Sequence, residues 1–139
     1  MRILVIDAQG GGIGKQLISA IKQELPETKI TAVGTNSNAT AAMLKAGADE
    51  AATGENPVVV CAKSADVIVG PIGIVIADAL LGEITPKMAL AVAQSKAVRI
   101  LIPFNHCGHF IAGVSDLNTK TLISDALQKI KSLQTPHND

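Results

Sequence analysis

Three consecutive sequence patterns in the N-terminal 26 residues together restrict the fold. Residues 3–6 form an unbroken aliphatic run, which is typical of a strand covered on both faces. Four glycines follow between positions 10 and 14. Apolar residues then recur at helical spacing over 13–25, and Pro26 ends that helix. A buried strand, a glycine turn and an amphipathic helix predict the first unit of a parallel α/β sheet.

The same alternation of strand and helix continues along the chain. Strands are expected over residues 3–6, 30–33, 48–53 (an edge strand), 67–69, 98–102 and 110–114. Helices are expected over residues 13–25, 37–46, 57–64, 74–81 and 86–95, and a last one ends near 133. The expected helix caps are Asn36, Asn56, Thr85, and Ser115 or Asp116. We therefore expect a three-layer open α/β sheet, mainly parallel, with about five to six strands and helices on both faces.

The length of 139 residues predicts one domain over residues 1–133, followed by a polar tail over 134–139. Apolar residues make up 47% of the chain and aromatic residues only 1%, so the core is expected to be aliphatic. The chain has neither tyrosine nor tryptophan. This composition excludes tyrosine catalysis and the aromatic platforms on which some domains stack nucleic-acid bases.

Charge and hydropathy limit which binding partners and which cellular compartment are expected for this chain. Twelve basic and twelve acidic residues cancel and are interspersed, so no nucleic-acid partner is expected. The longest apolar stretch, residues 67–81, is interrupted by glycine, proline and aspartate and is too short to span a bilayer. Asp7 follows the N-terminus too closely for a signal peptide. We therefore expect a cytoplasmic protein that does not interact with membranes.

The glycine-rich turn is the main candidate for a binding site. Glycines allow the backbone to approach a ligand, and the N-terminus of the following helix presents free N–H groups to an anion. A nucleotide or another phosphate-bearing small molecule is therefore expected at this turn. The alternative is a tight strand-to-helix turn that binds nothing. The residues of the candidate site are Gly10, Gly11, Gly12, Ile13, Gly14 and Lys15.

The turn matches the dinucleotide fingerprint G-x-G-x-x-G only in part. Gly10 and Gly12 fit, but the third glycine would fall at Lys15. The end of the second strand, residues 34–36, lacks the acid that usually binds the ribose hydroxyls of NAD, and it has no arginine for NADP. NAD(P) is therefore one candidate cofactor, and other nucleotides are equally open.

Two further templates compete for the same turn. Gly14 and Lys15 fit the end of a P-loop, but Gln16 replaces the hydroxyl that binds magnesium, so ATP hydrolysis is not expected. Gly12, Ile13 and Gly14 match part of the short-chain dehydrogenase turn, whose catalytic tyrosine cannot exist here. The three templates agree on a phosphate-bearing ligand and disagree on its identity.

Other candidates lie at the same predicted edge of the sheet. Thr35 and Asn36 follow the second strand and could reach a ribose or a phosphate, with helix capping as the alternative for Asn36. Gly70, Pro71 and Gly73 follow the strand over 67–69 and could flank a ligand with bare backbone. Their alternative is a rigid turn.

The segment after Pro103, residues 105–109, has the highest density of potentially catalytic or metal-binding side chains in the chain. Asn105 and His106 are the candidate catalytic residues, on the expectation that the loop lies at the ligand edge. Cys107 and His109 are also metal-ligand types, but no second cluster accompanies them, so no metal site is expected. Catalysis here would belong to a small homo-oligomeric enzyme, with the apolar segment 74–81 partly buried against a partner subunit.

Several segments together resemble one family. They are residues 7–15, 34–36, 46–48, 53–56, 69–74 and 81–86. The chain resembles a small bacterial family of unknown function, domain of unknown function 3842, over about residues 1–114. The resemblance implies a Rossmann-like domain without an assigned activity and carries over no catalytic residues. Three interpretations stay open: a nucleotide-binding sensor, regulator or subunit, a homo-oligomeric enzyme, and a structural or interaction protein without a ligand.

Overall fold

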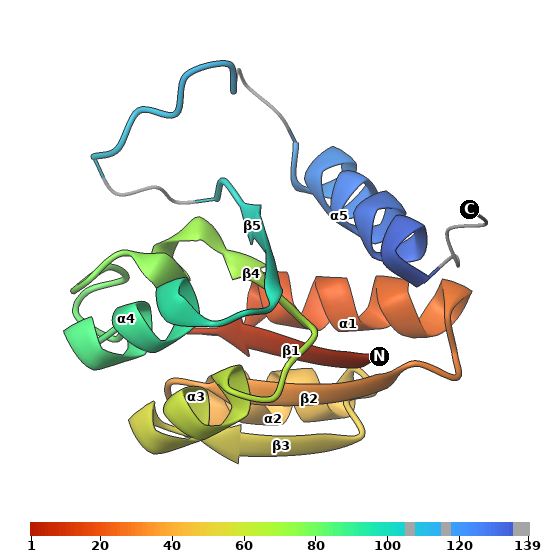
Figure 1. Ribbon diagram of the computed structural model, residues 1–139, viewed down its shortest axis with the longest axis horizontal. Helices are drawn as coiled ribbons and strands as arrows, with labels where there is room; N and C mark the ends of the chain where they lie inside the picture. The colour runs from red at the N-terminus through yellow and green to blue at the C-terminus, as the bar shows by residue number, and fades with distance from the viewer. Residues whose placement is uncertain (105–107, 115–117, 135–139) are drawn as a thin grey trace.

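Five parallel strands form the sheet of the computed structural model, which describes residues 1–104, 108–114 and 118–134 (Figure 1). Their order is β3-β2-β1-β4-β5, and every neighbouring pair is parallel. The strands are β1 (Arg2–Asp7), β2 (Lys29–Gly34), β3 (Glu50–Thr53), β4 (Val67–Pro71) and β5 (Val98–Ile102). This order is that of the Rossmann fold, in which the chain direction across the sheet reverses beside β1.

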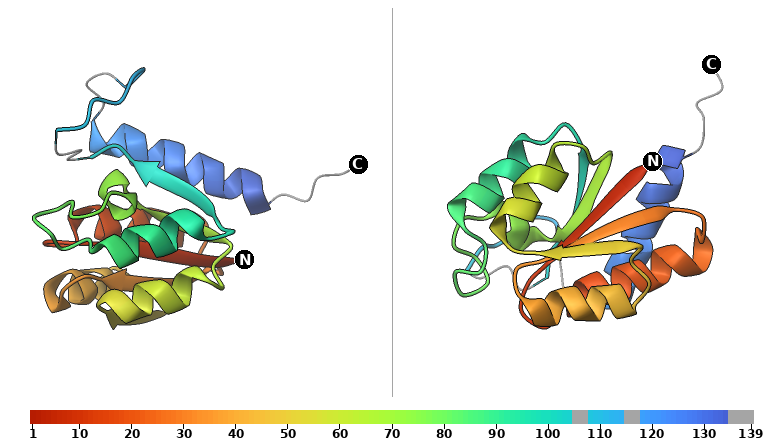
Figure 2. Two further views of the ribbon diagram at one scale, coloured as in Figure 1. Left: turned by 60° about the vertical axis from the view of Figure 1, so that its left-hand side comes forward. Right: turned by 90° about the horizontal axis from the view of Figure 1, so that it is seen from below.

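Helices cover both faces of this sheet, as the right-hand view of Figure 2 shows. The helices are α1 (Gly12–Glu24), α2 (Ser37–Lys45), α3 (Glu55–Ala62), α4 (Pro86–Gln94) and α5 (Thr119–Gln134), with a short 3-10 helix, η1 (Ile72–Val75). Helices α1, α2 and α5 lie on one face, and α3 and α4 lie on the other. The prediction of a three-layer α/β sheet is confirmed.

Strand β1 supplies both hydrophobic cores because successive side chains point to opposite faces of a strand. Ile3 and Val5 pack with the helices α1, α2 and α5, whereas Leu4 and Ile6 pack with α3 and α4. All four side chains are buried. The unbroken aliphatic run in the sequence therefore reflects a central strand that is covered on both sides.

The predicted helix over 74–81 is wrong. Only the single turn of η1 forms, and a folded-back loop follows in which Asp78, Leu80 and Leu81 have positive φ angles, a backbone conformation that no α-helix contains. The amide of Asp78 donates to the carbonyl of Ile84, and the amide of Ile84 donates to the carbonyl of Ala79. Because the loop buries Leu80 and Ile84 in the core, its apolar composition reflects core packing rather than a helical face.

The predicted strand over 110–114 is also wrong, because these residues pair with no strand and form only a turn at 112–113, which leaves β5 at the edge of the sheet. Residue Phe110 is 88% exposed. The predicted caps of the last helix, Ser115 and Asp116, lie outside the described residues. The side chain of Asn118 accepts a hydrogen bond from the amide of Thr121 at 2.8 Å and caps α5 instead.

The remaining boundaries differ from expectation by small amounts. Helix α3 begins at Glu55 after Gly54, so Asn56 is not its cap. Helix α5 continues through Gln134, one residue into the predicted tail, and the rest of that tail lies outside the described residues. The caps at Asn36 and Thr85 are confirmed, because each side chain accepts the expected backbone hydrogen bond.

Candidate functional site

A pocket of about 240 Å³ lies at the carboxyl ends of β1 and β4, where the strand order reverses. Ligands of open α/β sheets bind at this switch point. The β1–α1 turn forms one side of the pocket, and residues from the ends of β4 and β5 and the start of α5 form the other. Its lining is Asp7, Ala8, Gln9, Gly10, Gly12, Ile13, Gln16, Pro71, Leu80, Phe104 and Thr119.

Two glycines of the turn have a structural explanation. Gly11 has a φ of 72°, and a Cβ atom there would lie 2.9 Å from the backbone of Ala39. A Cβ atom on Gly14 would lie 2.5 Å from the Sδ atom of Met43 and 3.0 Å from the Cβ atom of Asp7. These glycines therefore allow α1 to pack closely against α2 and β1.

Gly10 and Gly12 have no such explanation. A Cβ atom on either residue would meet no other atom within 4 Å, and neither residue has a positive φ angle. Within the described part of the chain, no hydrogen bond occupies the amide of Gly10 or of Gly12. Both residues line the pocket. The backbone of both residues therefore borders the pocket, and their amides have no partner among the described residues.

The carboxylate of Asp7 caps the N-terminus of α1 from the end of β1. Its Oδ2 atom accepts the amide of Gly14 at 2.7 Å, and its Oδ1 atom accepts the amide of Ala8 at 2.8 Å. Burial raises the pKa of Asp7 above its ordinary value, although the hydrogen bonds from Gly14, Ala8 and Ile13 act in the opposite direction. The Gly14 amide thus donates its hydrogen bond to the carboxylate of Asp7 and is not available to a bound anion.

Glu83 joins the folded-back loop to two other segments at the ligand edge. Its Oε1 atom accepts from the hydroxyl of Thr35 at 2.7 Å, the side-chain amide of Asn36 at 2.7 Å and the backbone amide of Gln9 at 3.1 Å. Partial burial acts to raise the pKa of Glu83, but these hydrogen bonds outweigh burial and lower it. Glu83 therefore positions the glycine turn against the end of β2.

Sequence reasoning missed Glu83 for a physical reason. It lies 47 residues from Asn36, and only the folded-back loop brings the two together. The acid that the dinucleotide template requires after β2 is absent from residues 34–36, yet a carboxylate from another segment lies beside Thr35 and Asn36. A local motif cannot reveal an acid supplied from so far along the chain.

The other candidate residues fall into separate groups. Ile13 and Pro71 line the pocket, whereas Gly70 and Gly73 are buried and do not belong to its lining. Lys15 is exposed on α1 and is not part of the lining. The roles of Gly70 and Gly73 toward a ligand stay predictions.

The proposed catalytic residues Asn105 and His106 lie outside the described residues, as does Cys107. Phe104, which precedes them, lines the pocket. In the ranges 1–104, 108–114 and 118–134 no group of three His, Cys, Asp or Glu residues could hold a metal ion. Among the same residues, no helix has the length and the apolar character needed to cross a bilayer.

Substituting Glu83 with glutamine is expected to destabilise the fold by about 1 kcal/mol at pH 7, because the charged acceptor of three hydrogen bonds is lost. The pKa of Glu83 is lowered in the fold, so its carboxylate stabilises the protein above the ordinary value of 4.5. That contribution disappears as the pH falls through the folded-state pKa. Urea unfolding of both proteins at pH 7 and at successively lower pH measures the difference.

The matched control for this substitution is Glu27→Gln. Glu27 is exposed and forms no hydrogen bond with the described residues, so its substitution is expected to leave the unfolding free energy unchanged. Equal effects of the two substitutions, or a Glu83→Gln effect that grows as the solution is acidified, would contradict the positioning role of Glu83.

The strand order and the pocket beside β1 define an α/β protein of the Rossmann-like class. The chain belongs to the family described as a domain of unknown function (DUF3842), whose model matches residues 2–135. The resemblance seen in the sequence is therefore confirmed. None of the curated proteins matches the sequence.

Two solved structures are similar to this chain, and the first of them, with a TM-score above 0.5, shares its fold. The Escherichia coli heptosyltransferase WaaC with ADP is 15% identical with a TM-score of 0.53, over 100% of this chain and 50% of that one. The dodecameric FMN-dependent Ubix-like decarboxylase from Escherichia coli O157:H7 is 14% identical with a TM-score of 0.46, over 100% of this chain and 98% of that one. The chain thus spans half the length of the heptosyltransferase, and the likeness concerns the fold alone.

Proposed function

We propose that this protein binds a nucleotide or another phosphate-bearing small molecule in the switch-point pocket, with the phosphate over Gly10 and Gly12. The observation that carries the proposal is the pair of glycines that packing and backbone conformation do not require. Their amides have no partner among the described residues. Both lie at the N-terminal end of α1, where the helix dipole favours negative charge.

Charge around the pocket favours one group of phosphate ligands. The described lining contains the carboxylate of Asp7 and neither lysine nor arginine. A terminal phosphate with a double charge would therefore meet a like charge without a compensating cation. The bridging phosphates of a dinucleotide or a nucleotide sugar carry less charge per group and fit this surface better than ATP.

The size of the pocket also favours a ligand of which only the phosphate and a sugar enter the pocket. Ligand pockets usually enclose about 300–1,000 Å³, and this pocket encloses about 240 Å³. It has room for a phosphate group and the sugar beside it. The base and any second nucleotide would extend over the surface outside the pocket.

A thermal-shift series tests this proposal. The chain contains neither tryptophan nor tyrosine, so circular dichroism is a better readout than intrinsic fluorescence. The probes are NAD⁺, NADP⁺, ADP, ATP and S-adenosylmethionine, with inorganic phosphate as the control. A ligand present at about a hundredfold excess over its Kd stabilises the fold by about 2.7 kcal/mol. We expect NAD⁺ to raise the melting temperature more than ATP does.

Two results would contradict the proposal. One is a melting temperature that no probe at millimolar concentration changes. The other is a shift that inorganic phosphate reproduces in full, because such a result would reveal an anion effect without nucleotide recognition.

The homo-oligomeric enzyme and the ligand-free interaction protein stay predictions from the sequence. A homo-oligomeric enzyme would use Asn105 or His106, both outside the described residues. Self-association has a limited basis in Leu81 and Phe110, which are 94% and 88% exposed. The segment 74–81 does not supply the predicted interface as a whole, because Ile74 and Leu80 are buried in the protein's own core. The cytoplasm stays the expected compartment.

A further inference from the structure

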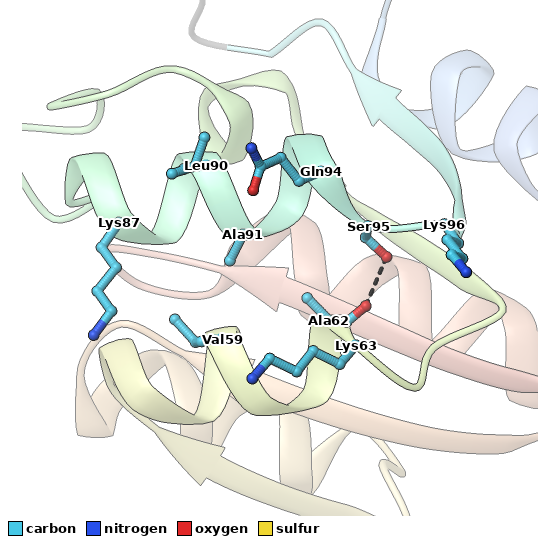
Figure 3. Close-up of a pocket in the computed structure, with 9 residues that line it drawn as sticks. All are labelled: Val59, Ala62, Lys63, Lys87, Leu90, Ala91, Gln94, Ser95 and Lys96. Carbon is cyan, nitrogen blue, oxygen red and sulfur yellow. Dashed lines mark hydrogen bonds between the residues drawn. The ribbon is translucent and has the colours of Figure 1, made fainter.

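A second pocket of about 480 Å³ lies between α3 and α4, on the face of the sheet away from α1 (Figure 3). It shares no lining residue with the switch-point pocket. Its apolar surface comes from Val59 and Ala62 on α3 and from Leu90 and Ala91 on α4. Leu90 is 55% exposed, so a large apolar side chain faces solvent at this groove. The volume lies within the range of small-molecule sites.

Three lysines surround this apolar surface. Lys63, Lys87 and Lys96 belong to the lining, which contains no acidic residue. None of the three side-chain ammonium groups forms an ion pair or a hydrogen bond with the described residues. All three are exposed. The groove therefore combines an apolar floor with three lysines that have no ion-pair partner among the described residues.

The polar groups are unevenly distributed along the groove. Lys63 follows the C-terminal end of α3, and Ser95 and Lys96 follow that of α4, whose last residue is Gln94. The hydroxyl of Ser95 donates to the carbonyl of Ala62 at 2.6 Å and joins the two helix ends. Figure 3 shows Val59 and Leu90 further along the groove, on the side where Lys87 lies. One end is thus polar and cationic, and the middle is apolar.

A second copy of the chain does not complement this charge. Each described helix carries at most one acidic residue, so none offers an acidic face to three lysines. A membrane surface is also a poor match, because lipid-binding clusters usually hold about four to eight basic residues. A small molecule with one negative charge and one apolar chain matches both the lysines and the floor.

We propose that the α3–α4 groove binds a free anionic single-chain amphiphile, such as a fatty-acid-type carboxylate. The head group lies near Lys63 and Lys96, and the apolar chain covers Val59, Leu90 and Ala91. Burying the chain supplies the main driving force, because it removes apolar surface of both ligand and groove from water. The lysines select for the charge of the head group.

Titration of the ¹⁵N-labelled full chain with sodium dodecanoate below its micellar concentration tests the proposal. We expect saturable shifts of backbone amide signals at Val59, Lys63, Leu90 and Ala91. Dodecyltrimethylammonium has the same chain length and the opposite charge, and it is expected to bind far more weakly. Butyrate keeps the charge without the chain and is expected not to bind.

Three variants separate the contributions. Leu90→Asn, at an exposed position, is expected to weaken dodecanoate binding about tenfold. Lys63→Gln and Lys96→Gln are each expected to weaken it roughly two- to fivefold. Lys45→Gln on α2, across the sheet, is the matched control and is expected to change nothing. A dispersed amide spectrum verifies that each variant is folded.

Several outcomes would overturn the proposal. One is equal affinity for the anionic and cationic amphiphiles. Another is dodecanoate binding whose amide shifts cluster away from α3 and α4. Binding to anionic lipid vesicles without binding of free dodecanoate would assign the groove to a membrane surface. The absence of any shift with every amphiphile would refute a small-molecule site and leave an acidic partner helix as the competing occupant.

Discussion

Gly12→Ala is expected to fold normally and to weaken ligand binding at the switch-point pocket at least tenfold. The added methyl group meets no protein atom within 4 Å, so the fold has no reason to change. Alanine is a better helix former than glycine and could raise the free energy of unfolding by up to about 1 kcal/mol. The same methyl group would occupy the space where the proposed phosphate approaches the backbone. Stability and binding are thus expected to change independently.

Calorimetric titration with the nucleotide that gives the largest thermal shift measures this loss, and urea unfolding measures the stability. Lys15→Gln is the matched control on the same helix, because Lys15 is exposed and lies outside the pocket lining. Binding by Gly12→Ala at wild-type affinity would contradict the placement of the phosphate. A large loss with Lys15→Gln would instead favour the P-loop interpretation.

Gly70→Ala is expected to produce the largest loss of stability, about 3 kcal/mol or more. Gly70 lies in β4 beside β1, and a Cβ atom there would be 2.3 Å from the carbonyl oxygen of Ile6. That oxygen belongs to the backbone of the central strand, so it cannot move without disturbing the pairing of β1 with both its neighbours. Overpacking against a rigid backbone has few ways to relax.

Urea unfolding followed by circular dichroism measures the effect, and Gly10→Ala is the control. Gly10 is exposed and has open space at its Cβ position, so its substitution is expected to change the unfolding free energy by less than about 0.5 kcal/mol. Similar stabilities of the two variants would show that the backbone near Ile6 adapts, and would remove the packing explanation for Gly70.

The sequence predicted the sheet well because the strands carry a simple signal. A run such as 3–6 in β1 is apolar without interruption, which is typical of a strand covered on both faces. Helix caps at Asn36 and Thr85 were equally readable, because their chemistry is local. These features are set by local sequence and do not depend on contacts with distant parts of the chain.

The segment 74–81 could not be interpreted in the same way. Its apolar residues satisfy core packing through a loop in which Leu80 and Leu81 adopt positive φ angles. Non-glycine residues rarely adopt that conformation, so nothing in their identity indicates it. Helix and buried loop share one apolar composition, and tertiary contacts decide between them.

The candidate site was only partly predictable for a related reason. The glycine turn is contiguous, and the sequence located it. Which glycines serve packing and which face open space depends on neighbours such as Ala39 and Met43, which belong to α2. Glu83 reaches the site only through the fold. Local chemistry therefore locates a site, and long-range packing assigns the role of each residue.

The central position of β1 has a consequence for how the chain acquires its structure during synthesis. Strands β1, β2 and β3 are adjacent in both sequence and space, so the first half of the sheet can form as soon as it leaves the ribosome. Strand β4 must then add to the open edge of the first strand made. Pro71 and Leu80, which close the pocket, arrive with that second half. A nascent chain thus carries the glycine turn long before the pocket is complete, and binding of the proposed ligand would report the completed fold.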